Sequence, residues 1–204
     1  MKIFAAAVVF GVSEYLKNIK VWFQVSLLLL VFGALYMIVM YYIPTEYAVL
    51  RIVLQILFAL VGIYFIIGIA QIACGSAKRD FVHSNITTLF TPLEVVWEPL
   101  GILVLFAIML YFGSIVILPA LIVWMLFQFG LWYNLESDAS IIRSMQYSIQ
   151  AFKKNLLNIL ALDGYILALV LTGYFLVFAL PICIPIAILT MSHFYLFGIS
   201  RQKK

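Results

Sequence analysis

The side chains that could do chemistry in this chain are a few ionisable and amide groups set inside long apolar segments. The clearest is Asp163, because an ionisable group inside a bilayer is costly and by default marks a functional site. It lies eight residues after Asn155, which in a helix corresponds to a depth of about 12 Å. His193 lies five residues before Gly198, at a depth of about 8 Å, so we expect the two side chains to meet across a helical hairpin.

Three glutamines are expected in the same half of the bilayer: Gln24, Gln71 and Gln128. Together with Asp163 and His193 they would form a polar cluster that opens toward the cytoplasm and could act as a proton-linked site. The alternative is plain hydrogen bonding between helices, which is worth only about 0.6 kcal/mol per contact inside membranes.

Two acids, Glu94 and Glu98, form a second candidate group at a predicted helix start. Their i, i+4 spacing puts both carboxylates on one helix face, where they could bind a cation. The simpler interpretation is a solvated helix start, which acids stabilise through the helix dipole. With His83 they are the only local set that an enzyme at the membrane interface could use. Because the sequence has no Walker loop, HExxH, GxSxG or CxxC motif, we predict no catalytic, cofactor or metal site.

The composition places these residues in a membrane protein. Hydrophobic residues make up 67% of the chain and charged residues 10%, whereas soluble domains carry about 25% charged residues. The net charge of +4 is spread in small groups at the ends of apolar runs, a pattern that suits anionic lipid head groups and not nucleic acid. We therefore expect residues 1–204 to form a single integral membrane domain. The four apolar runs are Val21–Ile43, Ile52–Ala77, Leu100–Leu135 and Leu156–Ser200.

The basic residues predict how the chain threads. Of the 12 Lys and Arg residues, all but Arg51 can lie on one side, which the positive-inside rule makes the cytoplasmic side. Basic residues flank both ends of the last two runs, so each must cross an even number of times. The prediction is an all-α polytopic bundle of six transmembrane helices in three hairpins, with both termini cytoplasmic. The expected spans are about 21–43, 52–75, 95–113, 119–135, 156–179 and 181–199, and a re-entrant hairpin is the alternative for the third run.

Amphipathic helices are predicted on the cytoplasmic surface at residues 1–20 and 137–154. In the second segment, apolar residues recur at three- and four-residue spacing. A Lys-Asn pair, Lys17-Asn18 or Lys154-Asn155, lies at or near the end of each segment, before a spanning run. Such helices can be plain connectors at the interface or docking surfaces for a partner. In the fifth span, small residues four apart predict a seam for close helix packing: Gly164, Ala168 and Thr172.

The stretch Ile117–Asn155 carries a family resemblance. It contains Ile-Leu-Pro-Ala-Leu at 117–121, an aromatic-rich helix to Trp132-Tyr133, and then Glu136, Ser140, Ser148 and Phe-Lys-Lys-Asn at 152–155. This arrangement resembles uncharacterised bacterial six-helix membrane proteins related to the membrane domain of glycerophosphoryl diester phosphodiesterases. Ala120 stands where that pattern has Gly, and Ser144-Met145 stands where it has Ala-Leu. The resemblance implies a six-helix protein of the bacterial cytoplasmic membrane, without the soluble domain that carries the catalysis in that family.

Three functions are compatible with these features. The favoured hypothesis is a non-enzymatic accessory or scaffolding protein that contacts membrane lipids, a membrane partner complex or a second copy of itself. The alternative is a small transporter or channel that uses the polar cluster around Asp163. A membrane-embedded enzyme acting on lipids ranks last, because the sequence offers it few acids and histidines.

Overall fold

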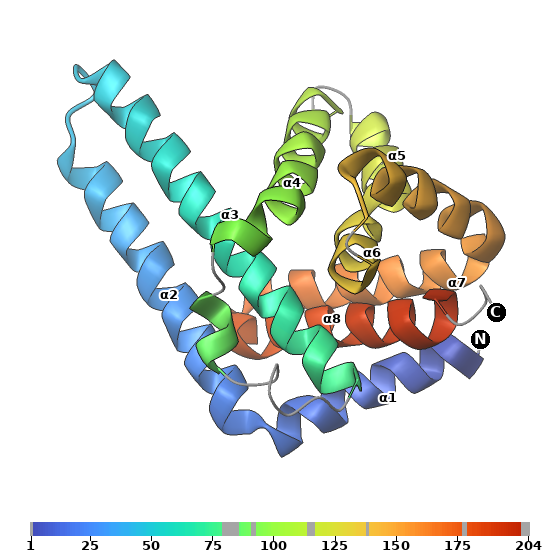
Figure 1. Cartoon of the computed structure of the whole chain (residues 1–204). Helices are drawn as coiled ribbons and strands as arrows, with labels where there is room; N and C mark the ends of the chain where they lie inside the picture. The colour runs from blue at the N-terminus through green and yellow to red at the C-terminus, as the bar shows by residue number, and fades with distance from the viewer. Residues whose placement is uncertain are drawn as a thin grey trace.

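The computed structural model describes residues 2–78, 86–90, 93–113, 117–137, 139–176 and 179–200, and over these ranges the chain is helical with no strand, which confirms the all-α prediction. The elements, drawn in Figure 1, are α1 (Lys2–Lys17), α2 (Ile19–Tyr42), α3 (Ala48–Lys78), the 3-10 helix η1 (Ile86–Phe90), α4 (Leu93–Gly113), α5 (Ile117–Phe127), α6 (Gly130–Ser137), α7 (Ile141–Phe175), α8 (Leu180–His193) and the π-helix η3 (Phe194–Ile199).

Four helical segments of the described chain are long and apolar enough to cross a membrane. They are Ile19–Tyr42, Ala48–Lys78, Ile141–Gly173 and Ile182–Ile199, which include most of the first, second, fifth and sixth predicted spans. The third predicted span, 95–113, lies in α4, whose apolar part Val96–Leu110 is shorter. The fourth, 119–135, is divided between α5 and α6. With 11 residues, α5 reaches only about 16 Å, roughly half of a hydrocarbon core.

The division between α5 and α6 coincides with a hydrogen bond from another helix. The backbone N–H of Phe129 donates to the hydroxyl oxygen of Ser148 on α7, at 3.1 Å. That donor is therefore taken out of the regular helical ladder, and the chain turns at Gln128 and Phe129 before helix resumes at Gly130. Ser148, 19 positions after Phe129, thus divides the third apolar run, which is continuous in sequence.

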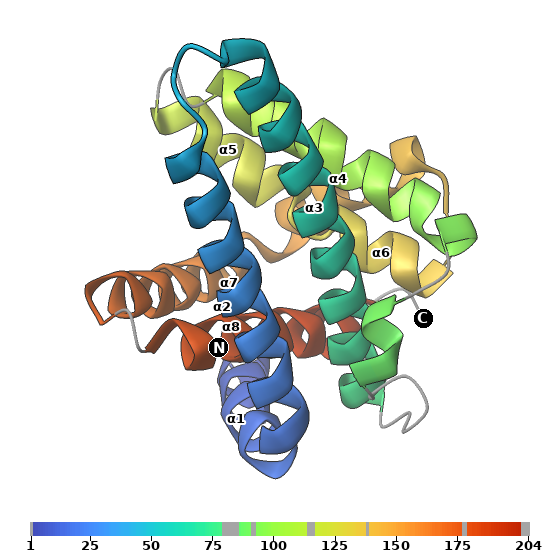
Figure 2. The ribbon, with the colours of Figure 1, turned by 90° about the vertical axis from the view of Figure 1, so that its left-hand side faces the viewer.

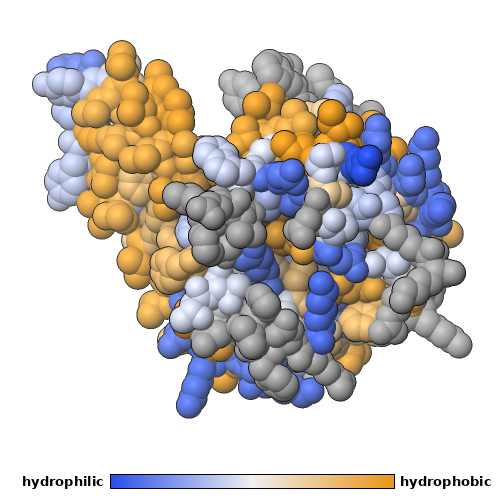
Figure 3. Space-filling model, viewed as in Figure 1, coloured by the Kyte–Doolittle hydropathy of each residue, from blue (hydrophilic) through white to orange (hydrophobic). Residues whose placement is uncertain are grey.

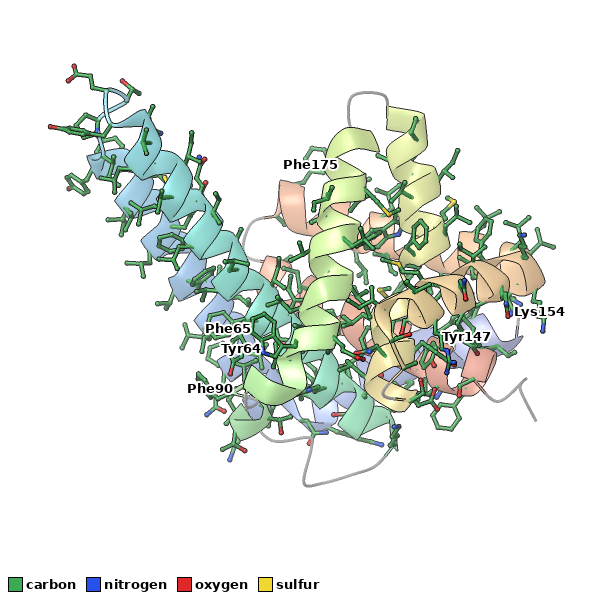
Figure 4. The ribbon with its side chains drawn as sticks, turned by 45° about the horizontal axis from the view of Figure 1, so that its top comes forward. Tyr64, Phe65, Phe90, Tyr147, Lys154 and Phe175 are labelled. Atoms are coloured by element: carbon green, nitrogen blue, oxygen red, sulfur yellow. The ribbon has the colours of Figure 1, made fainter. Side chains whose placement is uncertain are left out.

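Both Lys-Asn pairs mark a change of helix direction. Asn18 separates α1 from α2 with φ −110° and ψ 36°, and Asn155 interrupts α7 with φ −125° and ψ 26°. The Asn155 side-chain amide donates to the carbonyl of Ala151 at 3.3 Å, a local bond that competes with helix continuation. The predicted surface helix 137–154 and the fifth predicted span are therefore the two arms of α7. Tyr147 on the first arm, labelled in Figure 4, stacks on Tyr133 of α6 with ring centroids 4.0 Å apart.

The centre of the protein is α8 together with η3. Of the residues in the apolar stretch Ile182–Ile199, 72% are buried inside the protein, compared with 11–22% in the other three membrane-capable stretches. A helix that is apolar on all sides is stable only when it is covered on all sides. Here α1, α2, α3 and α7 supply that cover, and Figure 1 shows α1 running beside α8.

The N-terminal helix α1 packs against α8 with one of its faces. Ala7 and Tyr15 of α1 are buried, and Gly11 lies so close to α8 that a Cβ built on it would be 2.2 Å from the hydroxyl oxygen of Thr190. The opposite face of α1 exposes Val9 and Leu16. The helix predicted at residues 1–20 therefore packs on the core with one face and leaves the other apolar face uncovered.

The α2–α3 hairpin extends away from this core, as Figures 1 and 2 show from two directions. Aromatic contacts join its two helices: Phe32 lies 5.4 Å from Phe58 and 5.5 Å from Phe65 between ring centroids, and Tyr36 lies 5.4 Å from Phe58. Most of its large apolar side chains face outward, and Figure 3 shows the hairpin as a continuous hydrophobic surface.

Candidate functional site

Asp163 lies on the second arm of α7 and is hydrogen-bonded from α5 and the turn that follows it. The indole Nε1–H of Trp124 donates to Asp163 Oδ1 at 3.3 Å, and the side-chain amide of Gln128 donates to Oδ2 at 3.1 Å. Trp124 and Gln128 are four positions apart, so one helical turn presents both donors to the same carboxylate. The predicted association of Asp163 with Gln128 is therefore observed, and Trp124 is a partner that the sequence analysis missed.

Gln128 is the buried member of this group. Its side chain is 6% exposed, and its Oε1 atom has no hydrogen-bond partner among the described residues. Asp163 itself is half-buried. The carboxylate thus receives its hydrogen bonds from two neutral donors, Trp124 and Gln128. The Gln128 side chain also carries a buried acceptor atom, Oε1, that is not used in these bonds.

The other members of the predicted polar cluster lie in different surroundings. His193, at the end of α8, stacks between Phe10 and Phe197, with ring centroids at 4.5 and 4.6 Å. Gln24 is exposed on α2, and Gln71 is half-buried on α3. Their similar predicted depth in the bilayer did not bring these side chains to the Asp163 carboxylate.

The small-residue seam predicted in the fifth span lies on an exposed face of α7. Gly164, Ala168 and Thr172 are exposed, and a Cβ built on Gly164 meets nothing within 4 Å in the described structure. The hydroxyl of Thr172 donates to the carbonyl of Ala168 in its own helix, at 2.8 Å. Among the described residues, the seam therefore packs no helix against α7.

Of the interface acids, Glu98 is held by the side-chain amide of Asn134, which donates to Glu98 Oε2 at 3.1 Å. The same amide donates to the carbonyl of Ala139, so Asn134 connects α4 and α6 to the start of α7.

His83 and the side chain of Glu94 lie outside the described residues. Among those described, no three His, Cys, Asp or Glu side chains are grouped so that they could hold a metal ion.

Glu136, at the end of α6, makes a contact that sequence reasoning did not find. Its two carboxylate oxygens accept hydrogen bonds from the Tyr195 hydroxyl at 2.6 Å and the Ser200 hydroxyl at 2.8 Å. In an α-helix, residues five apart point about 140° away from each other. The wider π-helical turn of η3 reduces that angle, and the backbone N–H of Ser200 bonds to the carbonyl of Tyr195, so both hydroxyls can reach one carboxylate. Glu136 and Ser148, which carry part of the family resemblance, thus have packing roles here.

An apolar cleft of about 470 Å³ lies between the α2–α3 hairpin and α4. Trp97 at its edge is 70% exposed, and Tyr64, labelled in Figure 4, is half-buried in its wall. The hollow beside the hairpin is visible in Figure 3. Its lining residues are Leu60, Val61, Tyr64, Val96, Trp97 and Leu100.

Comparison with protein-family models, curated proteins and solved structures finds no match to this chain.

Proposed function

We propose that this chain is a non-enzymatic integral membrane protein of the bacterial cytoplasmic membrane that assists a membrane process by contacting lipids or a partner complex. The carrying observation is the uncovered apolar surface of the α2–α3 hairpin and of the cleft beside α4. Burial of apolar surface stabilises by about 25 cal/mol per Å², so a surface of this kind calls for lipid or protein cover. The cleft volume falls within the range of about 300–1,000 Å³ that is usual for ligand sites.

Photo-crosslinking tests this proposal. A benzoylphenylalanine replaces Trp97 in the cleft, and a control replaces Leu171, an exposed apolar residue on α7 that lies outside the cleft. The cleft position is expected to give a discrete protein or phospholipid adduct in native membranes, identified by mass spectrometry. The Leu171 position is expected to give only unselective lipid adducts. Equal adduct patterns at the two positions would count against a role for the cleft.

We also propose the full six-span topology, with both termini on the cytoplasmic side. The one-sided distribution of the basic residues supports it. Single cysteines are introduced at Glu46, Ala120 and Lys153 in a chain whose two native cysteines are replaced by alanine. An impermeant maleimide added outside should label positions 46 and 120 and spare position 153. Protection of position 120 from outside would indicate that α4 and α5 form a re-entrant hairpin.

The second candidate function is a small transporter or channel that uses the site around Asp163. The hydrogen bonds of Trp124 and Gln128 to this carboxylate favour it, since they build a polar site on a membrane-capable helix. Proton flux into liposomes containing the purified protein tests this function. Flux that is equal in the wild type and in Asp163→Asn would remove the candidate.

A further inference from the structure

We infer that Asp163 is a binding site for a single exchangeable proton, with Gln128 and Trp124 as positioning residues. The inference uses the same side chains as the second candidate function, but it does not require transport. Binding of a proton can be measured whether or not the proton crosses the membrane.

The first argument is the neutrality of the surroundings. Asp163 lies about 12 Å along the α7 arm that begins after Asn155, and its two hydrogen bonds come from an indole and an amide. Two neutral donors compensate a carboxylate charge only in part, and a charge that is removed from water without an opposite charge is costly. Uptake of a proton removes that cost, because it neutralises the carboxylate.

The second argument is the amide of Gln128, which can serve either state of the carboxyl group. In the ionised state, Nε2–H donates to Asp163 Oδ2, as the structure shows, and the buried Oε1 has no hydrogen-bond partner among the described residues. When a proton from water adds to Oδ2, a half-turn of the amide presents Oε1 as the acceptor for the new O–H bond. A side-chain amide carries a donor and an acceptor on one carbon, so a half-turn exchanges the two at the same position.

The third argument is that, within the part of the chain that the structure describes, no charged side chain acts on the Asp163 carboxylate. From the elements packed against this part of α7, the side chains that act on the Asp163 carboxylate are Trp124 and Gln128, and neither titrates at ordinary pH. Tyr165, two positions further along α7, is influenced by Cys183 of α8 and is not among the groups that act on Asp163. His193 is engaged by the rings of Phe10 and Phe197.

Infrared difference spectroscopy of the full chain in phospholipid nanodiscs tests the inference, with spectra taken between about pH 4 and pH 10. The wild type is expected to show the C=O stretch of a protonated carboxyl group that disappears as the pH rises. That band should be lost in Asp163→Asn and retained in Glu46→Gln, where the acid lies in an exposed loop. Identical spectra for the wild type and Asp163→Asn would overturn the inference.

A second variant tests the role of Gln128. Gln128→Leu keeps a similar volume but removes the acceptor, so the carboxyl band should shift to higher frequency and its pH midpoint should change. An unshifted band with an unchanged midpoint would show that Gln128 only fills space. If the Asp163 carboxyl band is present but no proton flux is measured, the transport function is rejected and the inference stands. The infrared and flux results are both independent of the crosslinking test at Trp97.

Discussion

The packing of α1 on α8 predicts that Gly11→Ala destabilises the protein. A Cβ at position 11 would lie 2.2 Å from Thr190 Oγ1, 3.0 Å from the carbonyl oxygen of Ile186 and 3.2 Å from the backbone nitrogen of Thr190. Ordinary contacts begin at about 3.5 Å, so α1 would have to retreat by roughly 1 Å. Rotation of the Thr190 side chain gives no full relief, because it breaks the 2.7 Å bond to Ile186 and leaves both backbone atoms in place.

The expected magnitude follows from two opposing effects. Overpacking of this kind costs about 1–3 kcal/mol, and contacts with backbone atoms put the cost in the upper part of that range. Alanine is favoured over glycine inside a helix by about 1 kcal/mol, which offsets part of the cost. The net loss of about 1–2 kcal/mol corresponds to a Tm lowered by roughly 2–8 °C for a chain of this size.

A thiol-reactive dye provides the assay, because Cys74 and Cys183 are both free and buried and become labelled as the protein unfolds. The matched control is Gly164→Ala, whose new methyl group meets open space. The control should melt at or slightly above the wild-type temperature, since it gains helix propensity without a clash. If Gly11→Ala melted no earlier than Gly164→Ala, α1 could not lie on α8 as described.

Three further substitutions test the polar and close contacts of the core with the same assay. Tyr195→Phe removes one of the two hydroxyl donors to Glu136 and should cost about 1–3 kcal/mol, whereas an unchanged Tm would show that this bond contributes nothing. Ser148→Ala leaves the N–H of Phe129 without its acceptor and should cost a similar amount, unless the turn re-forms as continuous helix, which hydrogen exchange at that amide would reveal. Gly68→Ala places a Cβ 2.6 Å from a backbone oxygen of η1 and should release η1 from α3, seen as faster proteolysis between α3 and α4.

The parts of the fold that the sequence predicted are those set by local properties. Length and hydropathy mark α2, α3, the second arm of α7 and α8, and an Asn after a Lys marks both bends. The break between α5 and α6 was not predictable in this way. It depends on Ser148, which lies in another helix and reaches Phe129 only after the chain has folded.

For the candidate site, the sequence predicted how far each side chain lies along its helix but not which way the side chain points. Counting residues along a helix predicts the depth of a side chain in the bilayer, and the predicted threading placed Asp163 and Gln128 in the same half. The same counting says nothing about which way each helix is rotated about its axis. For that reason it also grouped His193 and Gln24 with Asp163, although one stacks between aromatic rings and the other is exposed. Trp124 was missed because an indole in an apolar run is expected as a packing residue.

The central position of α8 has a consequence for biosynthesis. Because α8 and η3 follow the other described helices in the chain, they leave the ribosome after them. Helices α1, α2, α3 and α7 are therefore synthesised before their shared packing partner has been made. During that interval the face of α1 around Gly11 lacks the helix that lies against it in the folded protein. Assembly of the protein is completed only when α8 packs between these helices.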